Sequence, residues 1–312
     1  MSRSLALLFP GQGSQLAGMG KALARQFPVA AQVFAEADDA LGIKLSSLCF
    51  AGPDDALKLT VNAQPAIVAT SIAAFRVLEH ETGVRPTYVA GHSLGEYSAL
   101  VAAGALTLPD AARIVRERGR LMQEAVPVGV GSMAALFGLT AEEVQSVCVE
   151  AAQGQVVSPA NLNGGGQVVI AGHTDAVRRA ITLAKERGAK RAVELAVSAP
   201  FHCALMAPVA EGLARVLESV PMSPLQIAVI ANVTAEVNRD ASRMKDLLVQ
   251  QVTAPVRWEE SMVKLRELGC GAMLEVGPGK VLAGLLKRIV ADIPCPSFGE
   301  PASLDEAKGV MV

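Results

Sequence analysis

The feature that most constrains the fold is a serine held between two glycines, with a short apolar segment before it. The residues Gly91-His92-Ser93-Leu94-Gly95 match the pattern G-x-S-x-G, and they follow the apolar segment 87–90. A strand, this pattern and then a helix are typical of a nucleophile elbow, a sharp turn that exposes the serine hydroxyl. Glycines are needed on both sides because larger side chains would clash in so strained a turn. The pattern therefore predicts an α/β fold with Ser93 as a nucleophile; a simple Gly-Ser helix cap is the alternative.

A serine nucleophile needs a base, and the chain has only four histidines. His92 lies inside the predicted turn, where its side chain is expected to point away from Ser93. His80 lies at a charged helix end, and His173 lies in a turn of the middle segment. His202 remains, and by elimination it is the best candidate for the base, with a purely structural histidine as the alternative.

One arginine falls on the apolar face of the helix predicted over 110–125. With 3.6 residues per turn, Arg118 lies about 40° around the helix from Ile114, between that residue and Val115. A buried guanidinium keeps its proton and needs an anion. That anion could be an internal carboxylate, or a substrate carboxylate gripped through two parallel hydrogen bonds. Helix geometry alone leaves both alternatives open.

The middle of the chain has a different order of elements from its two ends. Between residues 127 and 198 the predicted order is strand, helix, strand, strand, helix, strand. This βαββαβ order is typical of a ferredoxin-like unit. The prediction is a large α/β domain made of residues 1–126 and 199–312, with a ferredoxin-like insertion at 127–198. Hinges are expected at Gly129-Val130-Gly131 and Ser198-Ala199-Pro200.

Three local predictions depend on where turn residues fall. Gln64-Pro65 is expected to open a long helix that runs from Ala66 to Glu81. The polar and glycine-rich residues 161–166 are expected to form a loop between two strands. The tail after Pro294 is expected to be loosely ordered.

Composition and charge argue against several classes of protein. Of the 312 residues, 51% are hydrophobic and 19% are charged, so the chain can bury a large core. The net charge of −2 gives no reason to expect a nucleic-acid partner. No apolar run is long enough for a membrane span or a signal peptide, so a cytoplasmic location without a membrane is expected. Local basic clusters at 185–191 and 280–288 are either solvated helix ends or a surface for an acidic partner.

Metal and nucleotide sites also find no support in the sequence. The five cysteines are widely spaced and contain no CxxC pair, so neither a zinc site nor a disulfide framework is expected. Gly11 and Gly13 are followed by Leu16 where the dinucleotide fingerprint requires a third glycine. No bound cofactor or metal is therefore predicted.

Several short motifs taken together resemble those of the bacterial malonyl-CoA:acyl carrier protein transacylases, acyltransferases of fatty-acid and polyketide synthesis. The resemblance runs from Leu7 to about Val290, nearly the whole chain. Its motifs are Phe9-Pro10-Gly11-Gln12-Gly13-Ser14-Gln15, Gly91-His92-Ser93-Leu94-Gly95-Glu96, Arg118, Pro200-Phe201-His202, Gln251 and Glu275-Val276-Gly277-Pro278-Gly279. Several separate motifs in one order are far more specific than the elbow alone.

The resemblance implies a role for each catalytic residue. Ser93 would be the nucleophile and His202 its base. The backbone carbonyl of Gln251 would orient the His202 ring, so that no acidic third member is required. The backbone N–H groups of Gln12 and Leu94 would form the oxyanion hole.

The resemblance also bears on the fold and on the acyl group. It implies an α/β-hydrolase-like large domain that carries the ferredoxin-like insertion. Arg118 would pair with the malonyl carboxylate. Related polyketide acyltransferases that select malonyl tend to have phenylalanine before the histidine, and methylmalonyl users tend to have serine. Phe201 therefore implies malonyl, although many stand-alone bacterial members have serine at this position.

The implied reaction is a ping-pong transfer of malonyl from malonyl-CoA to the phosphopantetheine thiol of acyl carrier protein. A coenzyme A thioester is then a substrate, phosphopantetheine belongs to the partner protein, and a monomer is expected. One alternative is a thioesterase or esterase on the same elbow. It is disfavoured because such hydrolases usually place their histidine near the C-terminus, whereas His202 lies well before it. A second alternative is a module that binds carrier protein without catalysis, against which Ser93, His202 and Arg118 together argue.

Overall fold

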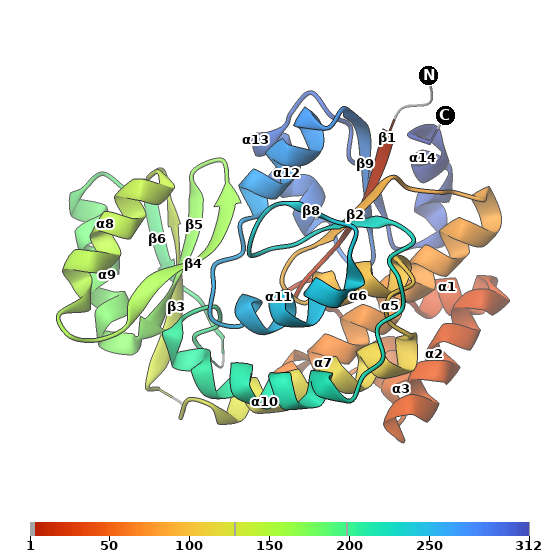
Figure 1. The fold of residues 1–312 in the computed structure, drawn as a ribbon, viewed down its shortest axis with the longest axis horizontal. Coiled ribbons are helices and arrows are strands. Elements are labelled where there is room, and N and C mark those ends of the chain that lie inside the picture. Colours follow the sequence, from red (N-terminus) through yellow and green to blue (C-terminus); the bar gives the residue numbers. More distant parts are fainter. Residues whose placement is uncertain (1–3, 128, 198, 312) are drawn as a thin grey trace.

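The computed structural model describes residues 4–127, 129–197 and 199–311, which form two β-sheets with their surrounding helices (Figure 1). The first sheet has six strands in the order β10-β9-β1-β2-β7-β8. These strands are β1 (Ser4–Phe9), β2 (Tyr88–Gly91), β7 (Ala228–Ile230), β8 (Val237–Asn238), β9 (Cys270–Val276) and β10 (Ser297–Phe298). All neighbouring strands in this sheet are parallel except β8, which pairs antiparallel with β7.

The centre of the six-stranded sheet is buried on both faces, which explains why its strands are continuously apolar. Leu7 and Phe9 of β1 face one side, where they join a core built mainly on α2, α5 and α7. Ala6 and Leu8 face the other side, where they pack with residues of α12 and α13. Because β1 and β2 are parallel and in register, with Leu7 opposite Val89, the segments that follow them leave the sheet at the same edge.

Helices from both ends of the chain surround this sheet. They are α1 (Lys21–Gln26), α2 (Pro28–Leu41), α3 (Leu45–Ala51), α4 (Asp54–Lys58), α5 (Thr60–Thr82), α6 (Gly95–Ala102), α7 (Leu108–Glu124), α10 (Ala207–Glu218), α11 (Met244–Gln251), α12 (Trp258–Glu267), α13 (Val281–Ile289) and α14 (Leu304–Gly309). Short 3₁₀ turns lie at η1 (Ala204–Met206), η2 (Ala241–Arg243) and η3 (Pro301–Ser303).

Helix α5 is the core helix of this layer, and its predicted start at Ala66 is wrong. The helix begins at Thr60 and contains Pro65. Its first turn is held from outside, because the Val61 N–H donates to Oε1 of Gln123 at 2.7 Å. Helix α5 is long and apolar enough to cross a membrane by length and composition, but 83% of that window is buried inside the protein.

The second sheet is antiparallel and has the order β4-β5-β3-β6. Its strands are β3 (Gly131–Phe137), β4 (Val157–Gly164), β5 (Gln167–His173) and β6 (Arg191–Glu194), and its helices are α8 (Ala141–Ala152) and α9 (Thr174–Glu186). The elements follow one another as strand, helix, strand, strand, helix, strand, the order expected from the sequence. Ser198, one of the expected hinge residues and the last residue of the expected insertion, lies outside the described residues, as do residues 1–3 and 312 at the ends of the expected large domain.

The second sheet is joined to the rest of the molecule by backbone hydrogen bonds, and the loop predicted over 161–166 is too long, because only Gly165 and Gly166 lie between β4 and β5. Strand β4 continues to Gly164. The N–H of Leu162 donates to the carbonyl of Val256, and the N–H of Val256 donates to the carbonyl of Ala160, both at 2.9 Å. Polar residues and glycines suggested a loop, but they occupy an irregular strand that contacts two partners.

The C-terminal tail is also ordered, contrary to the prediction. Ser297 and Phe298 form β10, which pairs with β9 at Glu275 and Val276. Phe298 is fully buried in the main core. A strand of two residues is too short to show an alternating or apolar pattern, so it cannot be predicted from the sequence without knowledge of its partner strand.

Candidate active site

Ser93 stands at a sharp turn between β2 and α6, and its φ of 50° lies in the left-handed region. A Cβ added at Gly91 would lie 1.9 Å from the carbonyl carbon of Gly95. A Cβ added at Gly95 would lie 2.0 Å from the carbonyl oxygen of Phe9. Both flanking positions therefore accept only glycine, which is the physical reason for the G-x-S-x-G pattern. The turn leaves Ser93 at the N-terminus of a helix, where free N–H groups favour negative charge.

His202 lies against this serine, although 109 residues separate the two in the chain. Its Nε2 is 2.7 Å from Oγ of Ser93, and its Nδ1 is 2.8 Å from the backbone oxygen of Gln251. A carbonyl oxygen can only accept, so in the neutral ring Nδ1 carries the proton and Nε2 is free to accept one from Ser93. Burial, together with the nearby charge of Arg118, lowers the pKa of His202 to about 3. The ring is therefore neutral at physiological pH, as a base must be.

Arg118 is buried with 2% of its surface exposed, as the helix periodicity predicted. Its Nη1 donates to Oε1 of Gln64 at 2.9 Å, and its Nη2 donates to Oε1 of Gln251 at 3.0 Å and to Oγ of Ser93 at 3.2 Å. The guanidinium also lies 5.5 Å from the ring centre of Tyr97. None of the ion pairs among the described residues includes Arg118. The cation is thus held by neutral groups beside the nucleophile.

Gln12 and Leu94 bring two backbone N–H groups to the same place. A Cβ on Gly11 would lie 2.4 Å from the carbonyl oxygen of His92, so the segment after β1 passes directly against the elbow. Gln12 and Leu94 both line the cavity that contains Ser93. Within the described part of the chain, neither backbone N–H donates to a protein acceptor. Two backbone donors without a protein acceptor among the described residues therefore belong to residues that line the same cavity as Ser93.

A cavity of about 380 Å³ opens onto these groups. Its wall is formed by residues around the six-stranded sheet and by residues of the second sheet. Its lining includes Gln12, Gln15, Lys58, Leu59, Ser93, Leu94, Arg118, Met122, Met133, Asn161, Leu195, Phe201 and His202. The cavity places Phe201 at the wall next to His202. Gln251 is not among these lining residues, because it lies fully buried behind Ser93 and His202.

The His92 side chain points away from Ser93, as expected. Its Nε2 is 2.9 Å from Oδ1 of Asn163 on β4, and its ring centre lies 5.4 Å from that of Trp258. His92 therefore connects the elbow to the second sheet and does not compete with His202 for the serine.

Three buried polar residues of the site were not found from the sequence. Gln64 binds Arg118. Asn232 accepts the N–H of Ser93 at 2.7 Å and donates to the carbonyl of Gly91 at 2.7 Å. Glu96 accepts from the side chain of Gln251 at 2.7 Å. Only Glu96 had a sequence signal, since it is an acidic residue directly after the elbow in an otherwise apolar helix turn.

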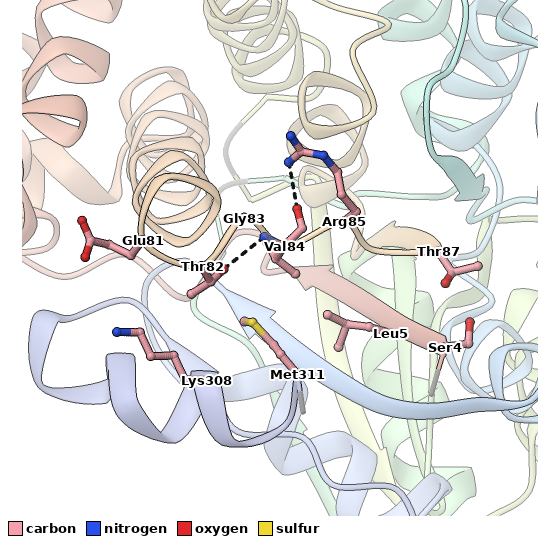
Figure 2. A pocket seen from close by; sticks show the side chains of 10 residues that line it. All are labelled: Ser4, Leu5, Glu81, Thr82, Gly83, Val84, Arg85, Thr87, Lys308 and Met311. Atoms are coloured by element: carbon pink, nitrogen blue, oxygen red, sulfur yellow. Dashed lines mark hydrogen bonds between the residues drawn. The ribbon is translucent and has the colours of Figure 1, made fainter. Parts of the chain in front are cut away.

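A larger cavity of about 630 Å³ lies away from this site, at the opposite ends of β1 and β2 (Figure 2). It is lined by Ser4, Leu5, Glu81, Thr82, Gly83, Val84, Arg85, Thr87, Lys308 and Met311. Its polar groups bond to their own neighbours, since the hydroxyl of Thr82 accepts from the N–H of Val84, and Arg85 donates to the Val84 carbonyl. Neither Ser93 nor His202 is near it.

Nearly the whole chain is similar in sequence to one family of enzymes. Residues 6–297 match the family model described as an acyl transferase domain. The chain is 48% identical to the malonyl CoA-acyl carrier protein transacylase of Bacillus subtilis, over 97% of this chain and 96% of that protein.

Two solved structures have nearly the same fold. An acyl carrier protein S-malonyltransferase from Vibrio cholerae has a TM-score of 0.95 and 48% identity, covering 97% of this chain and 99% of that one. A malonyl-transacylase in complex with a type II PKS acyl-carrier protein has a TM-score of 0.95 and 49% identity, covering 97% of this chain and 98% of that one. The similarity in each case extends over nearly the full length of both chains and is not confined to the elbow.

Proposed function

The chain belongs to the acyl transferase family, and we propose that it moves a malonyl group from malonyl-CoA to the phosphopantetheine thiol of an acyl carrier protein through an ester on Ser93. The observation that carries this proposal is the position of Arg118, whose Nη2 lies 3.2 Å from Oγ of Ser93. A buried cation beside a nucleophile suits an acyl group that brings its own carboxylate. The malonyl transacylases among its relatives point to the same acyl group.

In the first half-reaction, Oγ of Ser93 attacks the thioester carbonyl carbon while Nε2 of His202 takes the hydroxyl proton. The carbonyl oxygen of the tetrahedral intermediate would lie between the free N–H groups of Gln12 and Leu94. Each donor of this kind typically lowers a barrier by roughly 2.7–4 kcal/mol. The carbon–sulfur bond then breaks, the coenzyme A sulfur takes the proton from His202, and malonyl remains as an ester on Ser93.

Arg118 would hold the malonyl carboxylate during this step. In the free protein its guanidinium has only neutral partners, namely the amide oxygens of Gln64 and Gln251 and the hydroxyl of Ser93. A carboxylate that displaces the hydroxyl contact gains two charge-assisted hydrogen bonds. An internal carboxyl group, Glu96, has a nearby charge that favours the charged guanidinium, but it does not bond to Arg118, whose hydrogen-bond partners are all neutral.

In the second half-reaction, the carrier protein's phosphopantetheine thiol gives its proton to His202 and attacks the Ser93 ester. The carbon–oxygen bond breaks, Ser93 recovers its proton, and the malonyl thioester leaves on the carrier. This sequence is a ping-pong mechanism with a covalent intermediate. Phe201, at the cavity wall beside His202, would crowd an extra methyl group on the acyl chain and so favour malonyl.

The proposal includes a finer description of the fold. Residues 1–126 and 199–312 form an α/β-hydrolase-like domain, and residues 127–198 form a ferredoxin-like insertion. The elbow between β2 and α6 supports the first part, and the order β4-β5-β3-β6 supports the second. We place the protein in the cytoplasm as a monomer that acts without a bound cofactor, with phosphopantetheine supplied by its partner.

Intact-protein mass spectrometry tests the reaction directly. The protein is mixed with malonyl-CoA, and then with phosphopantetheinylated carrier protein. We expect a malonyl-sized mass gain that is absent in Ser93→Ala and that passes to the carrier. Steady release of malonate without a stable adduct would instead identify a hydrolase, and no reaction at all would favour a binding module.

A further inference from the structure

A buried carboxyl group lies behind the nucleophile without touching the cavity. Glu96 is in the first turn of α6, three residues after Ser93, and its side chain is fully buried. One of its oxygens, Oε2, accepts from Nε2 of Gln251 at 2.7 Å and from the backbone N–H of Asn232 at 3.2 Å. The other oxygen, Oε1, has no partner among the described residues. Both hydrogen bonds therefore converge on a single oxygen atom.

The two residues anchored by this oxygen hold both backbone polar groups of the nucleophile. Oδ1 of Asn232 accepts the N–H of Ser93 at 2.7 Å, and Nε2 of Gln251 donates to the carbonyl of Ser93 at 3.0 Å. Ser93 needs such support because its φ of 50° is unfavourable for a residue with a side chain.

Gln251 extends the same network to the other two members of the site. Its side-chain oxygen accepts from Arg118, and its backbone oxygen orients the ring of His202. The amide of Gln251 has one orientation in which all its partners are satisfied, because Arg118 can only donate and the Ser93 carbonyl can only accept. Movement of Gln251 would therefore displace the cation and the base together.

We propose that Glu96 is a positioning residue, whose oxygen Oε2 holds Gln251 and Asn232 in place around Ser93. The part of the inference that concerns malonyl transfer rests on the proposed function. The part that concerns the geometry of Ser93 does not.

The role depends on the position of an acceptor oxygen and not on a negative charge. Burial raises the pKa of Glu96 to about 7, against the opposing effect of the hydrogen bonds from Gln251 and Asn232 and of the nearby charge of Arg118, so the group changes protonation state within the physiological range. Both donors use Oε2, and Oε1 is free to carry the proton, so the acceptor is present in either state. Glutamine offers an oxygen at the same reach without the charge, whereas aspartate keeps the charge but is shorter by one methylene.

Glu96→Gln and Glu96→Asp form a matched pair that separates these two properties. We expect Glu96→Gln to keep kcat for malonyl transfer within about threefold of the wild-type value. We expect Glu96→Asp to lose about 10- to 100-fold in kcat, because small displacements of reacting groups have effects of this size. Thermal unfolding of each variant shows whether the chain is folded, and Glu96→Ala, which has no acceptor, serves as a second variant if Glu96→Asp does not fold.

Labelling of Ser93 by diisopropyl fluorophosphate gives a readout that does not require malonyl or a carrier. The serine oxygen forms a bond to phosphorus, fluoride leaves, and the serine proton passes to His202. The labelling rate should fall in Glu96→Asp and be retained in Glu96→Gln. Equal rates in all folded variants, or equal losses in both, would overturn the inference. Normal labelling without malonyl transfer by the wild type would overturn the proposed function and leave this inference standing.

Discussion

Strands β1 and β2 have a cavity at each of their two ends, and the larger cavity is not the one with the proposed catalytic groups. The cavity at their first residues measures about 630 Å³ (Figure 2). The one beyond their last residues measures about 380 Å³. At the larger cavity, Arg85 has 74% of its side chain exposed and forms an ion pair with Glu79 in solvent. At the smaller cavity, Arg118 is 2% exposed and has only neutral partners.

The difference teaches that buried, converging polar groups identify a site better than volume does. Removing a charge from water is costly, so a buried cation that forms no ion pair is a good indicator of a place where an anionic ligand can bind. Solvated charges at the first-residue end carry no such cost.

The largest effect is expected for His202→Ala. Loss of the base should slow acylation of Ser93 by malonyl-CoA by about 10²- to 10⁴-fold. Among the described residues, the Ser93 hydroxyl contacts only His202 and Arg118, and of these only His202 can accept its proton. Rapid-quench mass spectrometry measures the rate of adduct formation. A near-normal rate of Ser93 acylation in the variant would show that another group is the base. The smaller cavity would then no longer differ from the larger one by containing the base.

A selective effect is expected for Arg118→Ala. Transfer of malonyl should fall by about 100-fold, and transfer of acetyl much less, because only malonyl has a carboxylate for two charge-assisted hydrogen bonds. Steady-state kinetics with both thioesters measure the ratio. Arg113→Ala is the matched control on the same helix, since the Arg113 side chain is 57% exposed and should leave both rates unchanged. Equal losses for the two thioesters would contradict the carboxylate role.

A pH-dependent change in stability is expected for Glu96→Gln. Burial raises the pKa of Glu96 from 4.5 to about 7, so the folded state holds this proton more tightly than the unfolded state. The resulting stabilisation is complete below about pH 4.5 and is lost as the pH rises through about 7. Because glutamine cannot ionise, the free energy of unfolding of the variant should gain on the wild type by on the order of 2 kcal/mol between pH 5 and pH 8.5. Urea unfolding at both pH values measures the gain; a difference independent of pH would contradict it.

The smallest effect is expected at the larger cavity. Arg85→Ala should change malonyl transfer by less than about twofold, and the free energy of unfolding by less than about 1 kcal/mol, because exposed ion pairs contribute little. The same kinetic and unfolding measurements apply. A large loss of transfer would show that the first-residue end takes part in function.

The sequence was most informative where a short-range residue pattern reflects a short-range steric or packing requirement. Gly91 avoids a clash with Gly95 within the same five-residue turn, although Gly95 itself avoids a clash with the distant Phe9. The periodicity of α7 was enough to predict that Arg118 is buried. Element order in the middle of the chain could also be predicted, because it depends on short-range patterns. These features locate the proposed nucleophile and one buried cation.

Contacts between distant segments could not be predicted in this way. Asn232 reaches Ser93 across 139 residues, and Gln251 reaches Glu96 across 155, so neither pair leaves a periodic pattern. The start of α5 was misplaced for the same reason, since Gln123 stabilises the turn before Pro65 from another helix. Strand β10 has only two residues and exists because β9 pairs with it.

Of the four non-glycine residues with positive φ in the described chain, two are Ser93 and His202. A sequence optimised only for stability would have glycine at both positions, because glycine adopts a positive φ without strain. The proposed reacting pair therefore occupies positions at which thermostability and turnover make opposite demands. Selection for heat resistance alone should therefore replace these two residues early. The resulting protein would be more thermostable but would no longer turn over its substrate.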